Sequence, residues 1–128
     1  MFTSTRKLFR RAPDSPTEGT ITLTDDSERV LFDTGDVSDL AHRVQTALLS
    51  VTLNSHSSVT VRLRASINGD IVTVSDVSYN AAKINDLFGD INPDRVTSRR
   101  VRITIEGANA NPSTPGEVDF SISHTQAR

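Results

Sequence analysis

Hydrophobic and polar residues alternate without interruption over residues 59–67, which is the clearest pattern in the chain. Polar side chains separate five apolar positions, Val59, Val61, Leu63, Ala65 and Ile67. A period of two predicts a strand with one buried face. The next two residues, Asn68 and Gly69, suit the two positive-φ positions of a type I′ turn, so we predict that residues 59–78 form a β-hairpin.

A two-residue turn also predicts the register of this hairpin. We expect the apolar faces of its two arms to come together through the pairs Ile67 with Asp70, Ala65 with Val72, and Leu63 with Val74. On the opposite face, Arg62 is then expected across from Ser75, and Arg64 across from Thr73. This second face should be the outer one.

Four other segments alternate in the same way and predict strands. They cover residues 20–24, 28–32, 100–105 and 117–122. A turn at residues 25–27 predicts that the first two form a hairpin. If the last two pair with each other, an arginine-bearing face meets an acidic one, which contributes about 0.2–1 kcal/mol for each aligned pair.

The apolar spacing changes to a helical period after Asp36. The apolar residues of this stripe are Val37, Leu40, Ala41, Val44, Ala47, Leu48 and Val51. With Asp36 as the N-cap, the pattern predicts the main helix of the protein. A second, shorter helix is predicted over residues 81–88, with Asn80 as its cap and Gly89 at its end.

The predicted order of elements is therefore β-β-α-β-β-α-β-β. We predict a β-rich α+β fold with about six mainly antiparallel strands, one longer helix and one short helix. A single domain is expected over residues 19–124, after an N-terminal arm at residues 1–18 that contains basic residues and prolines, and before a tail at residues 125–128. A barrel, a sandwich and an open sheet all remain possible.

Composition limits the chemistry that the chain can perform. A chain of 128 residues with 35% hydrophobic residues can form one modest core. There is no cysteine, which excludes disulfides, thiol nucleophiles and thiolate metal sites. We expect no cofactor, because the chain has no glycine-rich phosphate loop and no G-x-G-x-x-G motif. We expect no membrane partner and no secretory signal, because no long apolar run is present. The compartment stays open, with a virion or the cytoplasm favoured over secretion.

The net charge of −2 hides a segregation of charge along the sequence. Residues 1–11 are basic without an acid, residues 12–39 are strongly acidic, and basic residues recur at 95–102. Arginine is well suited to bidentate contact with phosphate or carboxylate. The candidate contacts for a nucleic acid or a protein partner are Arg6, Lys7, Arg10, Arg11, Arg62, Arg64, Arg99, Arg100 and Arg102. The alternative is that the arginines pair with carboxylates, within the sheet or on another subunit.

The segment Val30-Leu31-Phe32-Asp33-Thr34-Gly35 resembles the active-site motif of aspartic proteases. In that family two carboxylates share one proton across a dimer or pseudo-dimer. The resemblance implies that Asp33 would be the catalytic group of a homodimeric enzyme. A strand end that is followed by a glycine and a helix cap explains the same residues without chemistry.

Metal sites have little support in the sequence. Asp90, Asn92 and Asp94 have the opening spacing of a calcium loop, but Arg95 and Val101 replace the glycine and the glutamate that such a loop needs. The three histidines, at positions 42, 56 and 124, have no ligand spacing. We therefore predict no metal site.

The leading hypothesis is a non-enzymatic structural or assembly subunit that self-associates through complementary charged surfaces. The expected partners are copies of the same chain or other structural subunits, in a coat, decoration or neck-and-tail component of a virion such as a phage. The alternative is a module that binds nucleic-acid phosphates through the basic arm and the arginine-rich strand. An aspartic-protease-like enzyme is the third hypothesis.

Overall fold

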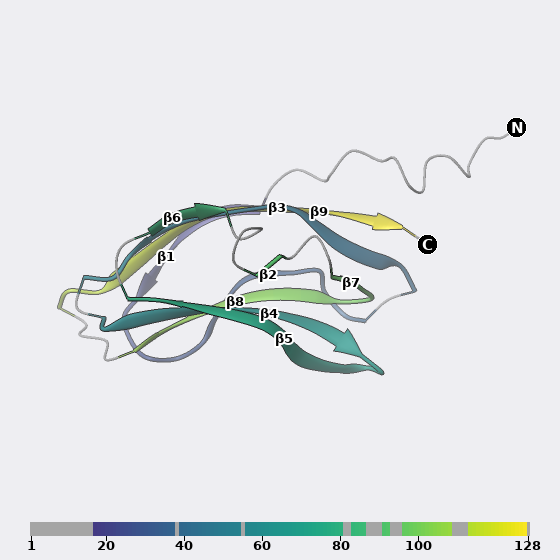
Figure 1. Cartoon of the computed structure of the whole chain (residues 1–128), viewed down its shortest axis with the longest axis horizontal. Coiled ribbons are helices and arrows are strands. Elements are labelled where there is room, and N and C mark those ends of the chain that lie inside the picture. Colours follow the sequence, from purple (N-terminus) through teal and green to yellow (C-terminus); the bar gives the residue numbers. More distant parts are fainter. Residues whose placement is uncertain are drawn as a thin grey trace, which may run out of the picture.

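The protein is a sandwich of two antiparallel β-sheets (Figure 1). The computed structural model describes residues 17–37, 39–54, 56–80, 83–86, 91–92, 96–108 and 113–127. Within these ranges there are nine strands and no helix. Sheet A has the order β1 (Thr17–Leu23), β9 (Gly116–Ala127), β3 (Ala41–Thr52) and β6 (Lys83–Asp86), with β7 (Thr97–Ser98) also paired to β3. Sheet B has the order β2 (Arg29–Asp33), β8 (Val101–Ala108), β4 (Ser58–Ile67) and β5 (Asp70–Tyr79).

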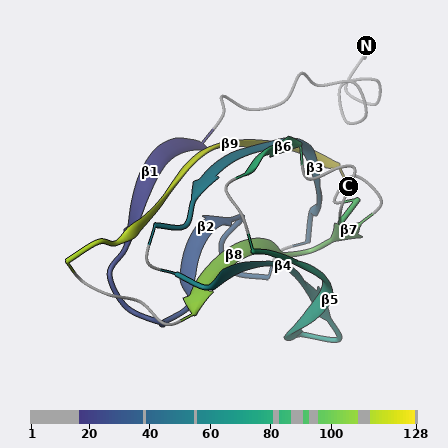
Figure 2. The same ribbon diagram turned by 60° about the vertical axis from the view of Figure 1, so that its left-hand side comes forward.

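The core lies between the two sheets, which Figure 2 shows as separate curved layers. Alternate residues of the central strands point inward, as the period of two requires. The fully buried apolar residues come from β4 and β8 in one sheet and from β3 and β9 in the other, and they include Val59, Val61, Leu63, Val101, Ile103, Ile105, Val44, Val118 and Ile122. Each such side chain contributes about 1.5–3 kcal/mol through burial, so these four strands hold the sandwich together.

The hairpin predicted from residues 59–78 is present as β4 and β5. Asn68 and Gly69 have positive φ angles of 54° and 89°, as the predicted turn requires. The pairs near the turn have the predicted register, from Ile67 with Asp70 to Arg64 with Thr73. A β-bulge then adds one residue to β5, so that Leu63 lies across from Ser75 in place of Val74 and Arg62 across from Asp76 in place of Ser75.

The predicted main helix is wrong, because Ala41–Thr52 forms strand β3. The pairing of β3 with β9 shifts register between Val44 and Thr46. This bulge changes the phase of the alternation, and the buried residues are His42 and Val44 before it and Ala47, Leu49 and Val51 after it. The spacing 44, 47, 51 imitates a helical stripe, although its cause is an irregular strand.

The predicted short helix and the α+β class are also wrong. Residues 83–86 form β6, which pairs with β3 from Leu48↔Asp86 to Val51↔Lys83, while residues 81–82 and 87–88 lie outside the described part of the chain. Main-chain pairing along the edge of β3 overrides the local helical pattern here. The protein is all-β in the part that the structure describes.

The other two predicted pairings also differ from the structure. The first two strands do not form a hairpin, since β1 pairs with β9 in sheet A and β2 pairs with β8 in sheet B. The bend at residues 25–27, where the Ser27 amide donates to the Asp25 carboxylate at 3.0 Å, therefore carries the chain from one sheet to the other. The last two strands, β8 and β9, likewise lie in different sheets. Among the described residues, strands run from Thr17 to Ala127, slightly beyond the predicted residues 19–124 at both ends.

Candidate functional site

Charged side chains of alternating sign cover the outer face of sheet B. The Nε and Nη2 atoms of Arg64 donate to the two carboxylate oxygens of Glu28 at 2.9 and 2.8 Å, and Nη1 of Arg64 donates to Thr73 at 2.8 Å. Nη1 of Arg62 donates to Glu106 at 2.6 Å and lies 3.7 Å from Glu28. The hydrogen bond from Arg64 is the main reason that the pKa of Glu28 lies below its ordinary value.

Asp33 is the centre of a second charged group on the same face. Nε and Nη2 of Arg100 donate to its two oxygens at 3.0 and 2.8 Å, and Nε of Arg102 donates to Oδ2 at 3.0 Å. The amide of Gly35 donates to Oδ1 at 2.9 Å. Partial burial would raise the pKa of Asp33, but the hydrogen bonds from Arg100, Gly35 and Arg102 outweigh it and lower the pKa to about 2.

This geometry gives Asp33 the environment of an ion-pair partner. The carboxylates of an aspartic-protease dyad must share a proton, which requires one of them to hold a proton at working pH. Both oxygens of Asp33 instead accept hydrogen bonds from charged donors that stabilise the ionised form. Thr34 also has a structural partner, because its Oγ1 accepts a hydrogen bond from the Val101 amide at 3.0 Å. The contacts of Asp33 and Thr34 therefore favour a structural explanation of this motif.

The structure brings together four of the arginines that the sequence singled out. Arg64 on β4 lies directly across from Arg102 on β8, and Arg62 lies across from Thr104 on the same face. Arg100 joins the group through Asp33, which it shares with Arg102. Their charges are largely neutralised by three carboxylates that sequence reasoning did not select as partners, Glu28, Asp33 and Glu106. The sequence signal for these partners was the same alternation of residues, since each acid lies beside or within a predicted strand. The sequence alternative in which arginines pair within the sheet is thus confirmed for these four.

The remaining predicted contact residues are not part of this face. Arg6, Lys7, Arg10 and Arg11 lie outside the described residues. Arg99 lies between β7 and β8, is exposed, and makes no ion pair with another residue of the described part of the chain. Nucleic-acid binding through the arm and Arg99 stays a prediction.

A hollow of about 360 Å³ crosses the outer face of sheet B, and residues from all four strands or their ends line it. They are Glu28, Val30, Arg64, Ile71, Arg102 and Thr104. Thr104, one of the lining residues, has only 2% of its surface exposed. The hollow thus combines two guanidinium groups, one carboxylate, one buried hydroxyl and two apolar side chains.

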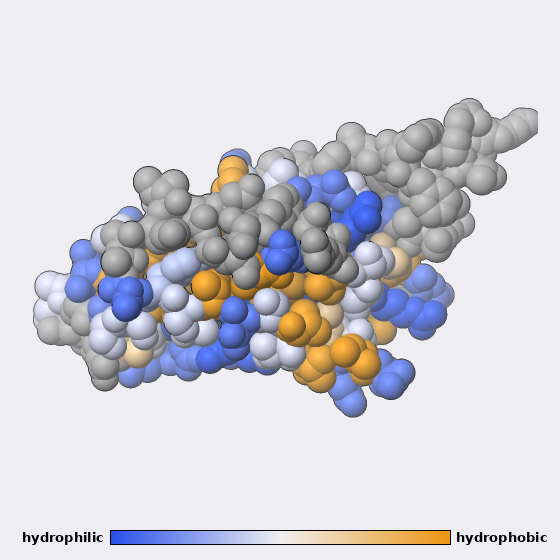
Figure 3. All heavy atoms as spheres, viewed as in Figure 1, coloured by the Kyte–Doolittle hydropathy of each residue, from blue (hydrophilic) through white to orange (hydrophobic). Residues whose placement is uncertain are grey.

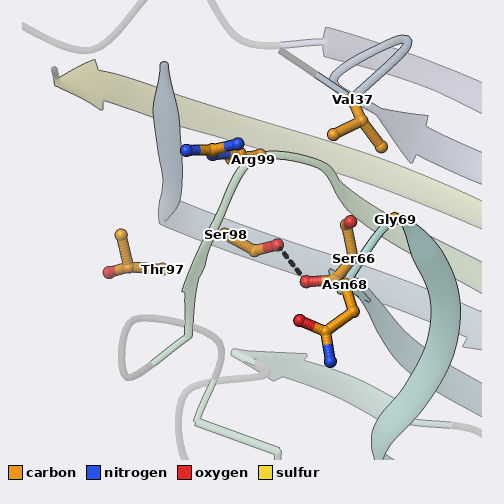
Figure 4. Close-up of a pocket in the computed structure, with 7 residues that line it drawn as sticks. All are labelled: Val37, Ser66, Asn68, Gly69, Thr97, Ser98 and Arg99. Carbon is orange, nitrogen blue, oxygen red and sulfur yellow. Dashed lines mark hydrogen bonds between the residues drawn. The ribbon is translucent and has the colours of Figure 1, made fainter. Parts of the chain in front are cut away.

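A larger pocket of about 590 Å³ lies beside the turn of the β4–β5 hairpin (Figure 4). Two of the lining residues are joined by a hydrogen bond, which the Ser98 hydroxyl donates to the Ser66 carbonyl at 2.8 Å. The side chains of Asn68 and Arg99 point away from each other in Figure 4. They do not converge on one point, so this pocket does not form a focused polar site.

Three exposed apolar residues lie at the turn end of the same hairpin, and we call them the hairpin surface. Ile67, Val72 and Val74 are 52%, 36% and 40% exposed. Val72 is paired with the buried Ala65, so the core side of the sheet is left uncovered at this point. In Figure 3, hydrophobic residues gather at the lower right, where Figure 1 places the end of this hairpin.

No cluster of histidine and acidic residues suitable for a metal ion occurs among the described residues. His42 and His124 lie with their ring centroids 5.2 Å apart, beside Phe32. His56 is buried, with its ring nitrogens 3.3 Å and 3.0 Å from the carbonyl oxygens of Ala108 and Leu23. Of the residues in the calcium-like segment, Asp90 and Asp94 lie outside the described residues. No helix long and apolar enough to cross a membrane occurs in the described part of the chain.

Comparisons with known proteins bear on the fold. No protein-family model matches the chain, and no curated protein matches its sequence. Among solved structures, the one titled "Crystal structure of PirA" superimposes with a TM-score of 0.59 at 7% sequence identity, over 85% of this chain and 95% of that chain. At such low identity, the similarity shows a shared fold and carries no information on activity. The chain therefore has the β-sandwich architecture of the PirA structure over most of its length.

Proposed function

We propose that this protein is a non-enzymatic structural subunit that self-associates through the outer edge of β5. The observation that carries the proposal is that one edge of this ten-residue strand is unpaired. Among the described residues, β5 pairs with β4 and with no other strand. A strand edge presents unpaired amide and carbonyl groups, which readily add to the edge of another chain. When β5 pairs with β5 of a second copy, the unpaired amide and carbonyl groups of both strands form hydrogen bonds.

The sequence of β5 supports this use of its edge. Natural proteins protect exposed edges with charged residues, proline or β-bulges. β5 has one bulge, between Thr73 and Ser75, and no proline. The charged residues of β5 are Asp70 and Asp76, and the segment between them, Ile71–Ser75, is uncharged and rich in β-branched residues. The exposed side chains of Val72 and Val74 lie in this segment. Pairing two copies would bury apolar surface in addition to joining main-chain groups.

The ion pairs of sheet B change the form of the assembly hypothesis. The sequence favoured contact through complementary charged surfaces, with Arg62 and Arg64 reaching a partner. These arginines already bind Glu106 and Glu28 within the chain. We therefore assign the main contact to the edge and the hairpin surface, and we give the charged face the role of stiffening the sheet. The setting in a virion stays a prediction.

Sedimentation velocity over a wide concentration range tests this proposal. We expect the native chain to associate as its concentration rises, and the double variant Val72→Lys, Val74→Lys to stay monomeric with unchanged circular dichroism. The matched control is Leu48→Lys, because Leu48 is similarly exposed, at 51%, but lies in the central strand β3. A native chain that is monomeric at high concentration and low salt would contradict the proposal. Association that responds to the Leu48 change and ignores the β5 changes would do the same.

A further inference from the structure

We propose that the outer face of sheet A binds the N-terminal segment of the same chain, residues 1–16, through its acidic side chains and one exposed leucine. Sheet A is the upper layer in Figure 1, and no described residues form a further layer over its outer face (Figure 2). The inference does not depend on self-association, because the β5 edge belongs to sheet B.

Three exposed carboxylates on this face form no ion pair with another described residue. They come from the neighbouring strands β1 and β9, and the register of these strands places them on the same side of the sheet, since alternate residues of a strand share a face. Val118, which lies between two of them on β9, is fully buried and so marks the opposite side. The three residues are Glu18, Glu117 and Asp119. The outer face of sheet A is therefore acidic without an internal counter-charge, unlike the outer face of sheet B.

Leu48 gives this acidic face an apolar contact point. Its side chain is 51% exposed and lies in the same row as Glu18, with Ser121 of β9 between them. A shallow hollow of about 270 Å³ opens beside it, lined by residues 48–50 and 119–121. An exposed leucine beside unpaired carboxylates fits a partner that combines large apolar side chains with basic groups.

The N-terminal segment has this composition. Residues 6–11 read Arg-Lys-Leu-Phe-Arg-Arg, so two large apolar residues stand between four basic ones, and residues 1–11 contain no acid. The sign of its charge is opposite to that of the acidic face. Leu8 and Phe9 supply the apolar side chains that Leu48 lacks as neighbours on its own face.

The starting point and length of the segment favour contact within one chain. The described chain begins at Thr17 on β1, and Leu48 lies two strands away, at a distance of about 10 Å. The residues from Phe9 to Thr17 can span up to about 27 Å when extended, which is enough to reach Leu48 and return. Pro16 has no amide hydrogen, so it favours departure of the chain from the β1–β9 ladder at this point. A tether this short holds the segment at an effective concentration on the order of millimolar.

Paramagnetic relaxation in the full-length chain tests the assignment. Because the chain has no cysteine, a Thr5→Cys variant carries a single nitroxide label. At low salt we expect the amide signals of Leu48, Ser50 and Ser121 to lose most of their intensity, while the signals of sheet B change little. Salt at about 0.5 M should restore the lost signals, because it screens exposed charges. Broadening that is spread evenly over both sheets would overturn the assignment.

Two lysine variants separate this contact from general charge. Asp119→Lys should reduce the broadening at Leu48 severalfold. Asp70→Lys, which makes the same charge change at an exposed carboxylate of sheet B, should leave it in place. Equal effects of the two variants would overturn the assignment.

A mixed sample identifies which copy supplies the segment. It contains spin-labelled chain without isotope enrichment and enriched chain without a label. We expect no broadening of the enriched chain at concentrations where the protein is monomeric. Broadening of its Leu48 signal there would assign the segment to a second copy and overturn contact within one chain.

Discussion

The imidazole ring of His56 occupies the space that a side chain at Gly107 would need. A Cβ atom at position 107 would lie 2.5 Å from Nδ1 of His56, and one at Gly116 would lie 2.5 Å from Cδ2. The ring thus packs against a glycine of β8 and a glycine of β9. One ring nitrogen lies near the carbonyl of Ala108, the last residue of β8 in sheet B. The other lies near the carbonyl of Leu23, the last residue of β1 in sheet A, so His56 links the two sheets.

Gly107→Ala is expected to destabilise the protein, because the added methyl group overlaps the buried ring of His56. We expect a loss of about 1–3 kcal/mol in the free energy of unfolding, measured by urea denaturation. Gly19→Ala is the control, since a Cβ at this exposed position approaches only the end of the Phe120 ring, at 3.2 Å. An equal loss in both variants would contradict the packing role of His56.

His56→Ala should destabilise the protein by about 2–4 kcal/mol, because it leaves a cavity and removes the hydrogen bond that the ring donates to a backbone carbonyl. The double variant His56→Ala, Gly107→Ala should lose less than the sum of the two single changes, because the missing ring makes room for the methyl group. Strict additivity would show that the two residues do not compete for the same space.

Asp33→Asn should lower the free energy of unfolding at neutral pH. It should also remove the part of the pH dependence of this free energy that comes from the titration of Asp33. The pKa of Asp33 is about 2 in the folded chain, below its ordinary value of 3.8, so its ion pairs stabilise the fold above pH 4 and are lost as the pH falls towards 2. After allowance for solvent screening, we expect about 1–2 kcal/mol. Denaturation of both proteins at several pH values checks this, and a difference that persists unchanged at pH 2 would refute it.

Reversal of Arg62 and Arg64 to glutamate should destabilise the folded chain by roughly 1–2 kcal/mol per site, because each new carboxylate faces Glu28 or Glu106. The matched control is Arg43→Glu with Arg99→Glu, which changes the net charge equally at two exposed sites. Similar thermal unfolding of the two double variants would show that the ion pairs of sheet B contribute little.

Local sequence patterns predicted the β4–β5 hairpin because its turn chemistry and its alternation agree. Asn68 and Gly69 fix the turn, and the register follows as far as Arg64. The bulge after that residue has no marker in the sequence, because one extra residue in a β-branched strand changes neither composition nor local propensity. The bulge after Val44 likewise gave the apolar residues of β3 a helical spacing in the sequence.

Long-range pairing could not be predicted from the sequence in hand. Residues 20–24 and 28–32 are adjacent in the chain, yet each pairs with a strand more than 60 residues away. The partners of Asp33 show the same difficulty, since Arg100 and Arg102 reach it only after β2 and β8 align. The arginines themselves were identifiable from charge clustering, whereas their neutralisation depended on the fold.

Amide hydrogen exchange on β5 tests the central claim of edge-to-edge association most directly. We predict that protection of the amides within Ile71–Ser75 rises with protein concentration, while the amides of β2, the other edge of sheet B, keep the same exchange rates. Exchange on β5 that stays fast and independent of concentration, in a sample shown by sedimentation to be associated, would contradict the claim.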